Sequence, residues 1–307
     1  MNDKQNILNE LFPASRQLPT LPVLYLEVSR MLDNPFSSSR EISLMLMKDQ
    51  AMVARILRLS NSALYAKPQE ITSLANAVTY LGTQTLKHII LQIAMVRMFP
   101  LDKKESPDFS AVTFWEHSLG TAFFTNTLEK KLNLPVSEDY YIGGLLHDLG
   151  KLMVYHYYPG KFKEILHLQM HENVDYNTAE EKVLGVNHAD IGEFLAQKWQ
   201  FKPPVLAAIR DHHKMLPAAA AAAAAEQPVH AAVVRIANMF AKAAGLCFPW
   251  DKCVFDIVGD PAWEILKIHA GGQVDVERLT FEIRDEAENI TASVKELLSK
   301  KKQRMEI

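Results

Sequence analysis

The chain has 307 residues, and 48% of them are hydrophobic, which is enough to bury one large core or two modest ones. The formal net charge is only −3, and the charged residues are spread along the chain. These values exclude a disordered tail and argue against a surface for nucleic acid or anionic membranes.

The start of the chain and its apolar runs predict a cytoplasmic protein. The first residues, MNDKQNILNELF, lack the basic and apolar regions of a secretion signal. The longest apolar run, residues 88–99, is interrupted by Gln92 and Arg97, so no membrane span is expected. The two cysteines, Cys247 and Cys253, form no CxxC motif, and reduced thiols fit them best.

Hydrophobic periodicity predicts an all-α protein. Apolar residues recur every three or four positions along most of the chain, and strictly alternating runs are missing. Ser38 and Glu41 have the spacing of a capping box, and Gly82 follows a periodic segment where a helix C-terminus is expected. Arg55 and Arg58 share one helical face, and we interpret them as solvated or ion-paired residues rather than phosphate ligands.

A polar, proline-bearing stretch, residues 99–109, marks the joint between two helical blocks. In the second block Thr178 and Glu181 have the spacing of another capping box, and Gly185 follows as a helix C-terminus. Residues 218–225 are eight alanines, which we interpret as stand-ins for unidentified side chains in a poorly ordered loop. The basic stretch 295–305 is interpreted as a solvated helix end, so a nucleic-acid partner is not expected.

Polar side chains fall on apolar helical faces of the second block. His117 lies on the apolar stripe that runs through residues 114–128, so it is predicted to point inward. Residues 140–156, YYIGGLLHDLGKLMVYH, are interpreted as one helix that places Asp148 inward and puts His147 and Lys151 on the neighbouring face. The run is apolar, and buried titratable side chains are costly unless they are paired or bound to a metal.

Three further segments add candidate ligands. His188 opens an apolar stripe, the sequence IRDHH supplies His212 and His213, and Asn238 lies on a stripe of small residues. A single inward histidine is more often an ordinary hydrogen-bonded core residue. Several imidazoles and one carboxylate spread over at least four helices are instead typical of a divalent metal site, with iron, manganese, zinc, cobalt or nickel as candidates.

The order of these motifs resembles the HD superfamily of metal-dependent phosphohydrolases. The motif HDLGK is preceded by WEHS and followed by NHADIGEFLAQKW and IRDHH. The resemblance implies that a first metal is held by His117, His147 and Asp148. It also implies a second metal, as in the HD-GYP branch, held by His188, His212 and His213. Asp148 and Lys151 would then be the catalytic pair, with Lys151 contacting phosphate.

The first block narrows this resemblance to the HDOD domain, a bacterial signal-output relative of the HD phosphohydrolases. The segments LPTLPVLYLEVSRMLDNP, SLMLMKDQAMVARILRLSNSALY and ITSLANAVTYLGTQTLKHIIL resemble its N-terminal half, and the match covers most of residues 15–215. It implies a helical subdomain at 1–105, an HD-like subdomain with the candidate metal site at 106–250, and C-terminal helices at 251–307.

Two departures bear on activity. Asn238 stands where the HD pattern has its last aspartate ligand, and a neutral amide oxygen holds a metal less tightly than a carboxylate. The GYP element is missing after HHKMLP, so hydrolysis of cyclic di-GMP is not implied. We therefore expect an HDOD-type regulatory protein with a partly retained metal site and with protein partners in signalling. The alternatives are a metal-dependent phosphohydrolase on a nucleotide or other phosphoester, and a nucleotide sensor without turnover.

Overall fold

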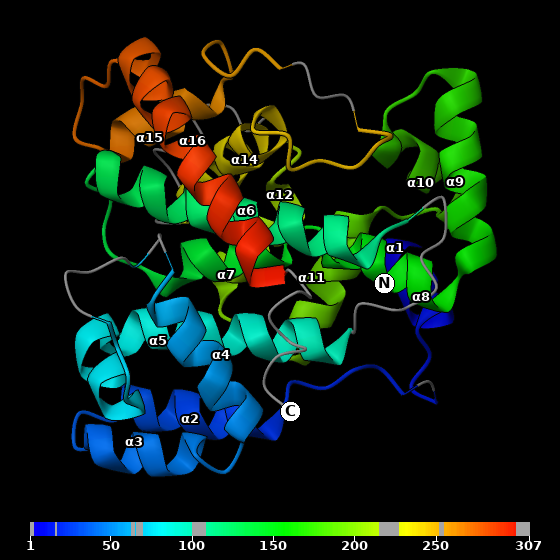
Figure 1. Cartoon of the computed structure of the whole chain (residues 1–307). Coiled ribbons are helices and arrows are strands. Elements are labelled where there is room, and N and C mark those ends of the chain that lie inside the picture. The colour runs from blue at the N-terminus through cyan, green and yellow to red at the C-terminus, as the bar shows by residue number, and fades with distance from the viewer. Residues whose placement is uncertain are drawn as a thin grey trace. The chain divides into compact units, whose positions relative to one another are not determined.

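Figure 1 shows the computed structural model of the chain, which describes residues 3–15, 17–62, 65, 70–99, 109–214, 227–251 and 255–298, without the side chains of Gln227 and Glu296. The secondary-structure elements within these residues are all helices, so the predicted all-α fold is confirmed. No helix in the described part of the chain is both long and apolar enough to cross a membrane.

The chain divides into two compact units. Unit 1 comprises Met1–Leu18 and Lys103–Thr291, and unit 2 comprises Pro19–Asp102 and Ala292–Ile307. The first helix, α1 (Asp3–Leu11), therefore belongs to unit 1, where it contacts α11. The last helix, α16 (Val276–Leu298), begins in unit 1 and ends in unit 2. The division into 1–105, 106–250 and 251–307 stays a prediction.

Unit 2 is built around its longest helix. Its helices are α2 (Val23–Asp33), α3 (Ser39–Leu46), α4 (Gln50–Ser60), α5 (Leu74–Met98) and the end of α16. Helix α5 packs against α2, α3 and α4. The predicted capping box at Ser38 and Glu41 is confirmed at the start of α3. Gly82 leaves helical geometry at φ 75° and ψ 169°, so the first helical segment of α5 ends there, as predicted, and a second segment follows directly after the kink.

Unit 1 is a helical bundle. Its remaining helices are α6 (Ala111–Lys131), α7 (Glu138–Leu146), α8 (Leu149–Tyr157), α9 (Pro159–Glu172), α10 (Tyr176–Leu184), α11 (His188–Lys198), α12 (Pro203–Asp211), α14 (Gln227–Ala243) and α15 (Ala262–His269). Helix α6 packs against α7 and α14, and α12 packs against α7, α11 and α14. The predicted inward stripe of α6 is confirmed, because Phe114, His117 and Phe124 are completely buried.

The prediction of one helix over residues 140–156 is wrong. Helix α7 ends at Leu146, and α8 begins at Leu149. Between them Asp148 leaves helical geometry at φ −99° and ψ 7° and takes the N-cap position of α8. Asp148 makes no side-chain capping bond, because its carboxylate faces the neighbouring histidines and Lys151, so the break lacks the local capping signal that a sequence can show. The break turns Asp148 and His147 into corner residues between two helices.

The predicted capping box at Thr178 and Glu181 is also wrong. Helix α10 begins at Tyr176, and its N-cap is Asp175, whose Oδ1 accepts a hydrogen bond from the Thr178 N–H at 3.0 Å. Aspartate competes with threonine for the same role and lies one turn earlier. Gly185 ends this helix in the left-handed region with a φ of 77°, as predicted.

Two remaining expectations concern cysteines and the alanine run. Cys247 is half-buried. Cys253 and the alanines at 218–225 lie outside the described residues.

Candidate metal centre

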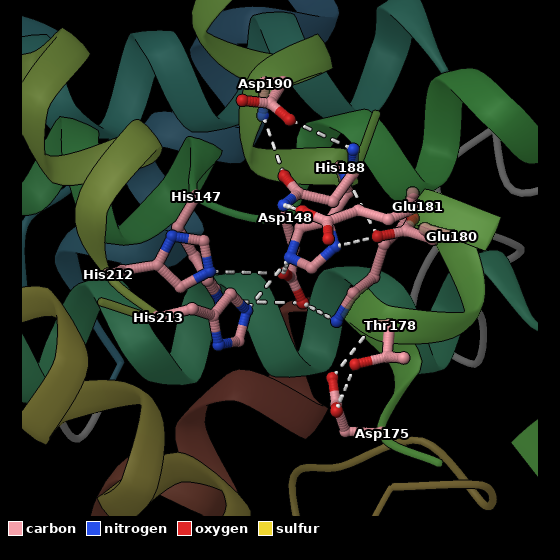
Figure 2. A network of polar contacts seen from close by, with 12 residues as sticks. His147, Asp148, Asp175, Thr178, Glu180, Glu181, His188, Asp190, His212 and His213 are labelled. Atoms are coloured by element: carbon pink, nitrogen blue, oxygen red, sulfur yellow. Dashed lines mark hydrogen bonds and ion pairs between the residues drawn. The ribbon is translucent and has the colours of Figure 1, made fainter. Parts of the chain in front are cut away.

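Four neighbouring segments of unit 1 bring the candidate ligands together. Figure 2 shows those of three of these segments, which are His147, Asp148, His188, His212 and His213. His117 comes from the middle of α6, and His147 and Asp148 form the corner between α7 and α8. His188 is the first residue of α11, and His212 and His213 follow the end of α12. Helix packing within this bundle therefore brings together residues that are distant in sequence.

The first group consists of His117, His147 and Asp148, which are completely buried. The Nε2 atoms of the two histidines lie 3.2 Å apart. Asp148 Oδ2 lies 3.4 Å from His117 Nε2 and 3.5 Å from His147 Nε2. Three donor atoms thus face one point.

The outer nitrogens of these two histidines fix their tautomers. His117 Nδ1 lies 2.8 Å from the carbonyl oxygen of Leu246, and His147 Nδ1 lies 2.8 Å from that of Gly144. A carbonyl oxygen only accepts, so each Nδ1 carries a hydrogen and each neutral ring directs a lone pair from Nε2. Two lone pairs that face each other repel, so this pair requires a cation between them, either a proton or a metal ion.

The second group consists of Asp148, His188, His212 and His213. Asp148 Oδ1 lies 3.2 Å from His188 Nε2 and 3.8 Å from His212 Nε2, and the Nε2 atoms of His188 and His213 lie 3.0 Å apart. Asp148 is common to both groups, and it turns one carboxylate oxygen toward each.

The outer nitrogens of the second group are anchored as well. His188 Nδ1 lies 2.6 Å from Glu180 Oε2, and His212 Nδ1 lies 2.7 Å from the carbonyl oxygen of Ile209. Metal-binding histidines almost always donate their other N–H to a carboxylate or a carbonyl, because this fixes the ring orientation and raises its basicity. Four of the five imidazoles therefore have the support that is typical of ligands.

The donor atoms fit a divalent metal by their spacing and because two of them have no hydrogen-bond partner among the described residues. Ligand atoms about 2.1 Å from one ion lie roughly 3.0 to 3.4 Å from each other in octahedral or tetrahedral geometry, which matches most of the distances above. Asp148 Oδ1 and His212 Nε2 are buried, and neither has a hydrogen-bond partner among the described residues. Unpaired polar atoms in a native core call for an explanation, and coordination of an ion is one of them.

Electrostatics keeps most of these groups in the protonation state that ligates. Burial holds the pKa of His147 and of His213 well below the ordinary value and lowers the pKa of His212 to about 4. Burial alone would raise the pKa of Asp148, but its basic neighbours His147 and Lys151 lower it well below the usual range. Neutral imidazoles and an ionised carboxylate are the forms that bind metals.

Lys151 lies at the edge of the cluster and is buried. Its Nζ lies 2.7 Å from Asp148 Oδ2, and its ammonium group lies 5.2 Å from the ring centre of Tyr176. Burial opposes the charged form of Lys151, but Asp148 and Asp251 outweigh it and raise the pKa. Lys151 thus remains charged and contacts the carboxylate that the two groups share.

The structure brings together six of the seven predicted ligands. They are His117, His147, Asp148, His188, His212 and His213. Asn238 is buried on α14, and its Oδ1 has no hydrogen-bond partner among the described residues, but none of the contacts described for the cluster includes it. The predicted ligand role of Asn238 stays a prediction.

Sequence reasoning missed two carboxylates near the cluster, one of them buried and one half-buried. Glu180 is completely buried and contacts His188. Asp251 Oδ2 lies 3.3 Å from Lys242 Nζ, and the charge of Asp251 favours the charged form of Lys151. Glu180 could have been noticed because it lies four residues after Tyr176 and four before Leu184, on the buried face of α10. Asp251 lies in an irregular segment that offers no periodic signal.

Comparisons with known proteins agree with this architecture. The family model of the HDOD domain matches residues 18–215. An uncharacterized protein of Treponema pallidum (strain Nichols) is 29% identical over 199 residues, which are 64% of this chain and 38% of that protein. The chain therefore spans less than two fifths of the length of this curated relative.

Solved structures with the same fold cover nearly the whole chain. An HDOD domain protein of unknown function from Geobacter sulfurreducens is 26% identical with a TM-score of 0.82, over 96% of this chain and 98% of that one. A protein of Shewanella amazonensis SB2B that is described as a candidate phosphohydrolase is 24% identical with a TM-score of 0.70, over 97% and 98%. Because the family model covers more than half of the sequence, the chain belongs to the HDOD domain family.

Proposed function

We propose that this chain is a metal-binding regulatory HDOD module whose unit 1 holds divalent metal through His117, His147, Asp148, His188, His212 and His213. The observation that carries the proposal is the pair of Nε2 atoms of His117 and His147, which lie 3.2 Å apart with both Nδ1 atoms bonded to carbonyl oxygens. Asp148 provides a second argument, because its two oxygens serve both groups.

Burial favours a stabilising and regulatory role over turnover. His117, His147, Asp148 and His188 are completely buried, and only His213 among the cluster is half-buried. A substrate would have to reach donors that are closed to water. A metal that binds only the folded state and joins α6, α11 and the α7–α8 corner stabilises that state by mass action, by about 2.7 kcal/mol at a hundredfold excess over its dissociation constant.

Metal analysis of the purified protein tests this proposal. We expect near-stoichiometric iron, manganese, zinc, cobalt or nickel in the wild-type chain and loss of that metal in His117→Gln and His147→Gln. His156→Gln, which changes an exposed histidine of the same unit, serves as the matched control and should keep its metal. The midpoint of thermal unfolding of the wild-type chain should also rise when the missing metal is restored after chelation.

A proton between His117 and His147 is the competing explanation for their close approach. In that case the folded wild-type chain would carry no metal and would not bind any of the five added ions, and the proposal would be wrong. The thermal measurement on the wild-type chain gives this answer even where a variant fails to fold.

A metal-dependent phosphohydrolase is the second candidate function. The observation that favours it is the contact between Lys151 and Asp148, because a charged lysine beside a ligand carboxylate is placed to bind phosphate. When bound, a divalent metal would supply Lewis-acid polarisation of a phosphoryl oxygen. A panel of nucleotides and phosphodiesters with the metal-loaded protein separates the candidates. Turnover that is lost in Lys151→Met, with the metal retained, supports the enzyme, and its absence throughout supports the regulatory module.

A further inference from the structure

A cleft of about 60 Å³ lies in unit 2, apart from the histidine cluster. Its walls come from α4, α5 and the last turn of α16, and they consist of Arg55, Arg58, Leu59, Gln92, Ile93, Val96, Leu297 and Leu298. A water molecule needs roughly 10 to 15 Å³ of such volume, so the cleft is large enough for several waters or for one tetrahedral oxyanion.

The two arginines of this cleft have no counter-ion among the described residues. Arg55 and Arg58 are half-buried, and neither forms an ion pair or a hydrogen bond with any residue that the structure describes. The predicted role was solvated or ion-paired, and no ion pair of either arginine is present among the described residues. Arg97 is an ion-paired arginine of this region, since both oxygens of Asp49 accept from its guanidinium group.

Local electrostatics favours an anionic partner for Arg55. Burial lowers the pKa of Arg55, and the positive charges of Arg97 and Arg58 lower it further, with Asp49 opposing them. Asp49 already serves Arg97 and caps the start of α4. A guanidinium group that is partly removed from water gains from a bidentate anion, and the planar fork of arginine matches a phosphoryl group.

The remaining walls indicate what the anion is attached to. Leu59, Ile93, Val96, Leu297 and Leu298 are aliphatic, and they lie beside the two guanidinium groups in the same cleft. Such a surface can cover the apolar part of an organic phosphate while the arginines bind its charged end. Binding of inorganic phosphate therefore tests only the interaction between the two arginines and the charged end of such a ligand.

We propose that this cleft binds the phosphoryl group of an organic phosphate, with Arg55 and Arg58 as the donors. The proposal does not depend on the metal centre, because it concerns the other unit. Effector binding in unit 2 would give the regulatory module an input site that is separate from its metal-binding unit.

Titration of the full-length, chelator-treated protein with inorganic phosphate, followed by calorimetry, is the test. Chelation prevents phosphate from binding to a metal in unit 1. We expect saturable binding to the wild-type chain at constant ionic strength, and an affinity that falls at least about tenfold in Arg55→Gln and in Arg58→Gln, as expected for the loss of a charged hydrogen bond. Arg40→Gln, an exposed arginine on α3 of the same unit, is the matched control and should bind as the wild type does.

Three results would overturn the proposal. They are the absence of saturable binding up to high millimolar phosphate, equal affinity in all the variants, and an equal loss in Arg40→Gln, which would indicate general charge attraction. Arg58→Lys adds a check that does not rely on removing charge. This variant should bind phosphate more weakly than the wild type, because lysine lacks the planar guanidinium group that donates two parallel hydrogen bonds.

Discussion

Glu180 shows how one buried carboxylate can set the protonation and orientation of a candidate ligand. Its Oε2 accepts from the backbone N–H of His188 at 2.8 Å and from His188 Nδ1 at 2.6 Å, so it fixes both the start of α11 and the tautomer of the ring. Burial would lower the pKa of His188, but the charge of Glu180 outweighs it and the pKa is raised. Higher basicity strengthens an imidazole ligand once a metal displaces the proton.

Glu180→Gln should therefore weaken metal binding and leave the fold in place. The amide oxygen of glutamine still accepts a hydrogen bond but carries no charge, and loss of such a supporting partner costs about 10- to 100-fold in metal affinity. Competition with a chromogenic chelator measures the affinity, and unfolding in excess chelator measures the fold separately. Glu181→Gln is the control, because the neighbouring side chain is exposed. Equal affinities in the two variants would show that Glu180 does not support a ligand.

At the scale of single residues, the sequence identified the candidate ligands but not the groups that support them. Histidine and aspartate in an apolar run are conspicuous, so six candidate ligands could be found from the amino-acid sequence alone. The supports are the carbonyl oxygens of Leu246, Gly144 and Ile209, and any residue type could supply them. Every residue has a backbone carbonyl group, so the sequence does not indicate which of them accepts a hydrogen bond, and these contacts were not predicted.

At the scale of helices, the cluster depends on the close approach of α8 and α11. A Cβ atom built on Gly150 of α8 would lie 2.0 Å from the carbonyl oxygen of His188 and 2.7 Å from its Cα atom. These are backbone atoms and cannot rotate away. The first turn of α8 therefore touches the residue that begins α11, and this contact sets the distance between Asp148 and His188.

Gly150→Ala should separate these helices and destabilise unit 1. Overpacking against backbone typically costs about 1 to 3 kcal/mol, and the helix propensity of alanine recovers less than about 1 kcal/mol of it. Urea unfolding with and without metal measures both the stability and the metal linkage. Gly160→Ala on α9 is the matched control, because no described atom lies within 4 Å of the added Cβ, and its stability should stay level or rise. A Gly150→Ala variant that is as stable as Gly160→Ala would contradict this packing.

Helix existence was easier to predict than helix ends. The buried stripe of α6 and the capping box at Ser38 follow from spacing alone, because they are local patterns. The corner at His147 and Asp148 depends on α11 packing against α8, which is a tertiary effect. Periodicity continued across the corner, so the sequence predicted one helix where the structure has two.

At the scale of the whole molecule, the histidine cluster lies in unit 1 and the arginine cleft in unit 2. The convergence of the histidines was expected because the order of motifs resembles a family pattern. The cleft was not expected, since it requires the last turn of α16 beside α4 and α5, and no local pattern relates these segments. A regulatory module with an effector site in one unit and a metal centre in the other would respond to two signals.

Unit 2 should lose stability in acid, because it buries a neutral histidine. Burial, with the charge of Lys87 in addition, lowers the pKa of His88 on α5 from 6.5 to about 3. Above pH 6.5 the folded and unfolded states bind equal numbers of protons at this residue. As the pH falls below 6.5, the unfolded state takes up a proton that the folded state refuses, so stability is lost by about 1.4 kcal/mol per pH unit, or about 2 kcal/mol at pH 5.

His88→Leu should remove this pH dependence from unit 2. Leucine of similar volume keeps the core filled and takes up no proton, so the opening free energy of α5 should become nearly flat between pH 6.5 and pH 5, apart from the contribution of other groups. Hydrogen–deuterium exchange of peptides from α5, corrected for the intrinsic exchange rate at each pH, measures that free energy. His156→Leu changes an exposed histidine of unit 1 and should keep the wild-type slope in α5. If the slope of His88→Leu equals that of the wild type, then His88 is not the group that makes unit 2 sensitive to acid.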